Sequence, residues 1–215
     1  MSQPTGTIMT YSRHRLAIDG EGVTTLVLLA GCPLRCRYCL NDYCHDDRPY
    51  RVFTPDELYE ELRIDNLYFQ ATGGGVTFGG GEPMVWSSFI EAFYRYVQSH
   101  VEGQMWRLSI ETSLHVDSEH VRRLLPIVDE WIVDIKDLNP AIYEAYTDRT
   151  VDKLMANLHV LAEAGLQDRV TIRLPQIPDY NTKEDIVHSE SQLRALGFTH
   201  FDHFQYKIKE SSRNK

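Results

Sequence analysis

Short apolar runs alternate with amphipathic helical patterns along most of the chain. Runs that are apolar on both faces are typical of strands buried in a parallel sheet. Repeated strand–helix units also imply right-handed crossovers between parallel strands. The pattern therefore predicts an α/β fold. Six strands are expected, over residues 24–31, 75–80, 107–112, 130–136, 169–177 and 201–208.

Helical patterns separate these runs. One helix is expected to begin after Thr54, an N-cap residue followed by Pro55 and, three residues after the cap, by Glu57. Six strands are too few for a closed eight-stranded (β/α)₈ barrel. Periodicity alone does not distinguish between two remaining folds, a flat doubly wound sheet and an open, curled barrel. Further helices are expected over 87–100, over 118–125, from about 154 to the stop at Gly165, and from Thr182 to before Gly197.

Size and charge narrow the class of protein. A chain of 215 residues suits a single domain, 1–215, with a substantial core. The net charge of −9 and the lack of a Lys/Arg cluster argue against nucleic acid as a partner. No apolar run approaches the roughly 20 residues that span a bilayer, so no membrane association is expected. The N-terminus lacks the apolar core of a signal peptide, and a cytoplasmic protein is expected.

Polar side chains recur where each predicted strand ends. Cys32 follows the first strand, and Glu82 follows the second. Later strands end at Asp134 and Lys136, and Arg173 lies late in the fifth. Any one of these residues could be a solvated loop residue. Because parallel α/β folds build their sites at the carboxyl ends of strands, the repeated placement predicts a common site there.

Four cysteines lie close together in the segment after the first strand. Cys32, Cys36 and Cys39 have the spacing C-x₃-C-x₂-C, and Cys44 follows. In a reducing compartment such a group indicates metal binding or catalysis more than disulfides. A zinc site completed by Cys44 or His45, or a non-catalytic iron–sulfur module, is one interpretation. Three cysteines on a cubane would leave one iron open to a small molecule.

The spacing, with an aromatic residue before the third cysteine, resembles the hallmark of the radical S-adenosylmethionine (SAM) superfamily. That family's fold is an open, partial (β/α)₆ TIM-like barrel of parallel strands. The glycine-rich stretch Gly73–Pro83 resembles the motif that binds the SAM amino group. Within the superfamily, four stretches resemble glycyl-radical-enzyme activating enzymes of the pyruvate formate-lyase activase type: Ile18–Cys36, Asp134–Lys136, Asn157–Gly165 and Arg173–Asn181.

The resemblance implies an oxidoreductase in which Cys32, Cys36 and Cys39 hold a [4Fe–4S] cluster. Reductive cleavage of SAM would give a 5′-deoxyadenosyl radical, which takes hydrogen from a glycine of a partner glycyl-radical enzyme. A flavodoxin or ferredoxin-type protein would supply the electron. Cys44 is expected to be a free thiol. The alternative is a radical SAM enzyme acting on a small molecule, such as a deazapurine carboxylate synthase.

The resemblance also implies roles for individual residues. Gly80, Gly81 and Glu82 would receive the SAM amino group, and Tyr38 would lie near adenine. Lys136 and Arg173 would pair with the SAM carboxylate or its surroundings. A monovalent cation is expected near Glu111 and Asp134, although Glu111 could instead pair with Lys136 or Arg173. The full set expected to bind cofactor is Tyr38, Gly80, Gly81, Glu82, Glu111, Thr112, Ser113, Asp134, Lys136 and Arg173.

Some positions depart from the activase pattern. Glu21 and Thr24 stand where proline and arginine are usual, and Leu40 and Lys207 stand where histidines are usual. The chain also lacks a long insertion that could bury a small substrate. A macromolecular partner is therefore expected to close the site, with Leu40 packing against it at the entrance.

Overall fold

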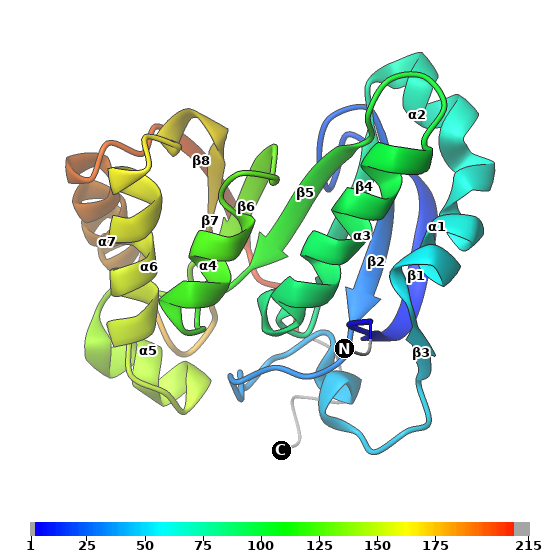
Figure 1. The fold of residues 1–215 in the computed structure, drawn as a ribbon. Coiled ribbons are helices and arrows are strands. Elements are labelled where there is room, and N and C mark those ends of the chain that lie inside the picture. Colours follow the sequence, from blue (N-terminus) through cyan, green and yellow to red (C-terminus); the bar gives the residue numbers. More distant parts are fainter. Residues whose placement is uncertain (1–2, 209–215) are drawn as a thin grey trace.

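The computed structural model describes residues 3–208, so the outermost residues of the expected domain, 1–2 and 209–215, lie outside the described range. Within it, eight strands form one sheet in the order β3-β1-β2-β4-β5-β6-β7-β8 (Figure 1). The parallel strands are β2 (Val23–Leu29), β4 (Gly75–Gly80), β5 (Arg107–Thr112), β6 (Glu130–Asp134), β7 (Val170–Gln176) and β8 (His200–Gln205). Strands β1 (Gly6–Leu16) and β3 (Arg51–Phe53) are antiparallel to their neighbours.

The sheet is open, because β3 and β8 are its two ends and do not pair with each other. Seven α-helices lie within the described part of the chain. The buried apolar side chains of the strands, such as Val27, Phe78 and Trp131, form one core with those of the helices. The helices are α1 (Pro55–Leu62), α2 (Asn66–Thr72), α3 (Ser87–His100), α4 (Ser118–Leu124), α5 (Pro140–Thr147), α6 (Asp152–Glu163) and α7 (Lys183–Ala195).

The predicted parallel strands are all present, and the expected open partial barrel is confirmed. The capping box at Thr54 is also present, since its side chain accepts from the Glu57 N–H and the Glu57 carboxylate accepts from the Thr54 N–H. Strands β1 and β3 and helices α2 and α5 were missed. The outer face of β1 is polar: Arg13 pairs with Asp65 at 2.5 Å, and the Tyr11 hydroxyl bonds Glu61. Such partly buried polar side chains give no hydrophobic signal.

The connection between β1 and β2, residues 17–22, folds across the inner side of the sheet. Asp19 is buried there, and its carbonyl accepts a hydrogen bond from the Thr77 hydroxyl on β4. The Ile18 carbonyl accepts from the Arg173 guanidinium on β7 at 3.2 Å. At Gly20, with φ of +134°, a Cβ would lie 2.8 Å from the Ser109 hydroxyl oxygen on β5. The chain thus fills this part of the barrel itself, leaving the carboxyl ends of the strands for a site.

Among the described residues, no helix combines the length and the apolar character needed to cross a lipid bilayer.

Candidate active site

A cavity of about 430 Å³ lies at the carboxyl ends of the parallel strands. The loop after β2 forms one wall, and the ends of β4 to β8 form the rest. All of the predicted site residues except Tyr38 and Glu82 line it. They are Cys32, Cys36, Cys39, Gly80, Gly81, Glu111, Thr112, Ser113, Asp134, Lys136 and Arg173. The placement of polar residues after successive strands therefore predicted where the cavity lies.

The three predicted cluster cysteines are half-buried free thiols, and Cys44 is buried beside them. Burial raises the pKa of Cys32 to about 12 and that of Cys36 to about 11. A hydrogen bond from Cys44 lowers the pKa of Cys39 to about 6, and the same bond raises that of Cys44. Cys39 is therefore the thiol most readily deprotonated, whereas Cys44 keeps its proton.

The three thiols fit an iron–sulfur cubane. Among the described residues, no three His, Cys, Asp or Glu side chains are arranged to hold a single metal ion. A cubane does not require this convergence, because each thiolate binds a different iron. Soft thiolate donors beside a cavity of this size suit a cluster with a small molecule bound next to it.

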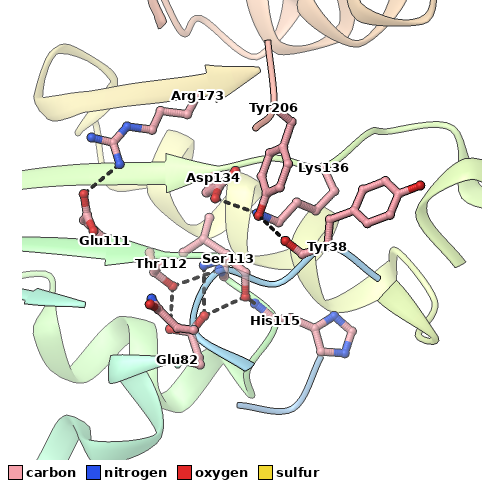
Figure 2. Close-up of polar contacts among 12 residues, drawn as sticks. Tyr38, Glu82, Glu111, Thr112, Ser113, His115, Asp134, Lys136, Arg173 and Tyr206 are labelled. Atoms are coloured by element: carbon pink, nitrogen blue, oxygen red, sulfur yellow. Dashed lines mark hydrogen bonds and ion pairs between the residues drawn. The ribbon is translucent and has the colours of Figure 1, made fainter. Parts of the chain in front are cut away.

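Glu82 lies beneath the cavity lining rather than in it. Its buried carboxylate accepts hydrogen bonds from the Thr112 hydroxyl at 2.7 Å, the Ser113 N–H at 2.9 Å and the Ser113 hydroxyl at 2.6 Å (Figure 2). The Met84 N–H donates a fourth, at 3.2 Å. Four donors from the chain itself thus surround Glu82. It holds the loop after β5 against the glycine-rich turn after β4.

Burial raises the pKa of Glu82 above its ordinary value, and the bonds from Ser113 and Thr112 oppose that rise. A raised pKa means that the folded state binds the Glu82 proton more tightly than the unfolded state does. The resulting contribution to the free energy of unfolding is full at a pH below the ordinary pKa of about 4.3, and it is lost as the pH rises through the folded-state pKa. We therefore expect the free energy of unfolding of the wild type to fall relative to that of Glu82→Gln over the pH range that begins at the ordinary pKa of about 4.3 and extends upward. Denaturant unfolding of both proteins across this range measures the difference. Parallel pH profiles would contradict the prediction.

Gly80 and Gly81 line the cavity, but the chain itself also requires them to be glycine. At Gly81 a Cβ would lie 2.1 Å from the Gly31 carbonyl oxygen, and at Gly80, with φ of +111°, it would lie 2.7 Å from the Leu29 nitrogen. The Gly81 and Glu82 N–H groups donate to the carbonyls of Leu29 and Gly31. The absent side chains let this turn lie directly against the start of the cysteine loop.

Two ion pairs form part of the cavity wall (Figure 2). The buried Lys136 ammonium donates to Asp134 Oδ2 at 2.6 Å, and this carboxylate raises the pKa of Lys136 even though burial lowers it. The second carboxylate oxygen, Asp134 Oδ1, is buried without a hydrogen-bond partner. Arg173 donates to Glu111 at 2.6 Å, so the ion-pair interpretation of Glu111 is the arrangement that the structure contains. The orphaned Asp134 oxygen is an acceptor available to a bound cation.

Tyr38 lies outside the cavity lining. Its hydroxyl donates to Asp179 at 3.1 Å, and its backbone carbonyl accepts from the Tyr206 hydroxyl at 2.9 Å. Tyr206 lines the cavity, whereas the neighbouring Lys207 is exposed and does not. Leu40, which was expected at the entrance, also lines the cavity. Sequence reasoning missed the remaining lining residues, which are Leu34, Asn41, Asp202, Phe204 and Tyr206. For β8 and the residue that follows it, the two-residue spacing of Asp202, Phe204 and Tyr206 was the available signal.

Comparisons with known proteins agree with this geometry. The family model described as the radical SAM superfamily matches residues 26–189. The (2S)-3-sulfopropanediol dehydratase activating enzyme of Klebsiella oxytoca is 28% identical, covering 87% of this chain and 76% of that protein. The pyruvate formate-lyase 1-activating enzyme of Escherichia coli K12 is also 28% identical, covering 80% of this chain and 68% of that protein. Among solved structures, Streptococcus suis SuiB bound to S-adenosylmethionine matches with a TM-score of 0.63 at 15% identity, over 84% of this chain and 40% of that chain.

Proposed function

The chain belongs to the radical SAM superfamily, and from that membership we propose that it is an activating enzyme which generates a glycyl radical on a partner protein. The observation that carries the proposal is the cavity that joins three free thiols to the polar carboxyl ends of the parallel strands. The two relatives described above are activating enzymes by name and align over most of this chain.

Family membership implies a [4Fe–4S] cluster and SAM as cofactors. Cys32, Cys36 and Cys39 would hold the cluster, and SAM would occupy the cavity beside them. When bound and reduced, the cluster supplies the electron that cleaves SAM into methionine and a 5′-deoxyadenosyl radical. The protein's own contribution is to bind, orient and shield these groups.

The charged side chains of the cavity suit the amino-acid portion of SAM. Lys136 offers an ammonium to the SAM carboxylate, and the free Asp134 Oδ1 offers an acceptor to its amino group. Because Glu82 is already surrounded by donors, its part is to position Thr112 and Ser113. A monovalent cation beside Glu111 and Asp134 stays part of the proposal. It would compete with Arg173, which already neutralises Glu111.

The open side of the sheet supports a protein substrate. Leu40 is 44% exposed and Phe204 is 37% exposed, and both line the cavity. An inserted glycine loop would bury these apolar side chains and exclude water from the radical. Leu40 is accordingly proposed to pack against the partner. We further propose an acidic flavodoxin or ferredoxin-type protein as the electron donor.

Electron paramagnetic resonance tests the function directly. We expect the reduced, cluster-loaded protein to form 5′-deoxyadenosine from SAM, and to produce a glycyl-radical doublet when a candidate glycyl-radical enzyme is added. A partner whose radical-bearing glycine is changed to alanine serves as the control and should give no doublet. Partner-independent turnover of a small molecule would instead favour the small-molecule alternative.

A further inference from the structure

Two arginines on the cysteine loop lack a carboxylate partner. Arg35 and Arg37 are exposed, and no Asp or Glu of the described chain lies within ion-pair distance of either. Among the described residues, the Arg35 guanidinium contacts only neutral groups, the His45 ring and the Cys32 carbonyl at 3.4 Å. Asp42 and Asp46 of the same loop act electrostatically on the neighbouring His45, and Asp46 pairs with Arg48. Neither forms an ion pair with Arg35 or Arg37 within residues 3–208, so the two guanidinium groups stay available on a chain whose net charge is −9.

The backbone holds both arginines in place. The Arg35 N–H donates to the Thr147 carbonyl at 2.9 Å, and the Arg37 N–H donates to the Tyr146 carbonyl at 3.0 Å. These bonds fix the loop along the carboxyl end of α5, toward which the blue segment after β2 extends in Figure 1. Arg149, which follows this helix end, is 43% exposed and is partly neutralised by Asp148 at 3.4 Å. Arg35 and Arg37 are thus presented at a fixed edge of the molecule.

This edge adjoins the cysteines but is separate from the cavity mouth. Arg35 and Arg37 directly flank Cys36, and neighbouring Cα atoms lie about 3.8 Å apart. Cys36 lines the cavity, whereas neither arginine does. A protein bound to these arginines would therefore approach Cys36 from outside the cavity and would not cover the exposed side chains of Leu40 and Phe204.

From this arrangement we infer that Arg35 and Arg37 form the docking edge for an acidic one-electron carrier protein. The inference rests on the proposed function, since it assumes a cluster held by Cys36. Opposite charge raises the encounter rate of two proteins and orients them, and salt weakens both effects. An overall negative chain needs such a local positive edge to receive a negative partner. The short path through Cys36 then serves electron transfer.

Stopped-flow reduction of the cluster-loaded protein by a purified, reduced flavodoxin tests this role. We expect Arg35→Glu/Arg37→Glu to lower the second-order rate constant about tenfold or more at low ionic strength. The deficit should shrink in 1 M salt, where the Debye length falls to about 3 Å. Reduction by dithionite, which needs no docking, should be unchanged. Arg122→Glu is the matched control, because Arg122 is an exposed arginine on α4 that forms no ion pair within residues 3–208.

Arg37→Glu alone is a second variant, which controls for a structural effect of the double substitution on the loop. The Arg37 side chain makes no hydrogen bond or ion pair with the described chain, so its replacement should leave the loop intact. This variant should show a smaller loss with the same salt dependence. The inference is overturned if both variants are reduced by flavodoxin as fast as Arg122→Glu. Dithionite-driven cleavage of SAM reports on the proposed function separately: its absence would refute that function, whereas its presence with an unaltered flavodoxin rate would refute only the docking edge.

Discussion

Replacing Cys32, Cys36 or Cys39 by alanine is expected to abolish both the [4Fe–4S] cluster and the cleavage of SAM. Each thiol lines the cavity, and each would bind a separate iron, so a neighbouring ligand cannot substitute for the one removed. Iron and sulfide analysis of anaerobically reconstituted protein measures the first loss, and chromatography of 5′-deoxyadenosine measures the second. Wild-type iron content in any of the three variants would contradict the assignment.

Cys44→Ala is the matched control for these variants. Cys44 is buried beside Cys39 and hydrogen-bonds to it, so it is the thiol best placed to act as an unexpected ligand. Because Cys44 does not line the cavity, whereas the other three cysteines do, it is expected to stay outside the cluster. The variant should retain iron and sulfide. Stable zinc binding that depends on Cys44, without iron uptake, would support the zinc interpretation instead.

Lys136→Met is expected to lower SAM affinity by about tenfold to a hundredfold while cluster content is retained. A hydrogen bond to a charged group contributes about 1.5–3 kcal/mol, which corresponds to roughly that range in affinity. Anaerobic calorimetry with SAM measures the change. Unaltered affinity would show that the buried ammonium does not contact the cofactor.

The same substitution is expected to destabilise the fold, because it leaves Asp134 without its cation. Breaking a buried pair costs about 3–5 kcal/mol, and about 2–3 is expected here because a third of the Asp134 side chain is exposed. Adding Asp134→Asn removes the uncompensated charge and should recover part of the stability without restoring SAM affinity. Chemical denaturation of the single and double variants separates the two effects.

The strands that the sequence predicted well are those whose environment is uniform. The parallel strands β4 and β5 are buried along most of their length and begin and end where expected. Strand β1 was missed because Tyr11 and Arg13 pack polar groups against acids of the neighbouring helical segment. Helix α5 was missed although Asn139 and Pro140 form an ordinary helix start. Its buried Tyr143 and Tyr146 do not make a conspicuous helical stripe.

In the candidate site, too, some features were predictable from the sequence and others were not. Chain position was sufficient to predict that Cys32, Asp134 and Arg173 share one cavity, because the carboxyl ends of parallel strands meet at one edge. Orientation was not predictable in this way. A carboxylate after a strand can face the cavity, as Asp134 does, or turn beneath it, as Glu82 does. The choice depends on hydroxyl and amide donors some 30 residues away, such as Thr112 and Ser113.

The hydrogen bond between Tyr206 and the Tyr38 carbonyl joins positions 168 residues apart. During synthesis the cysteine loop leaves the ribosome long before β8, which contributes Asp202 and Phe204 to the cavity. A nascent chain therefore presents its thiols for an extended period without the wall that shields them. Productive loading of the cofactor is therefore expected to follow the docking of β8 onto β7. We accordingly expect the thiols to need protection from oxidation and from other metals until this last strand of the sheet has docked.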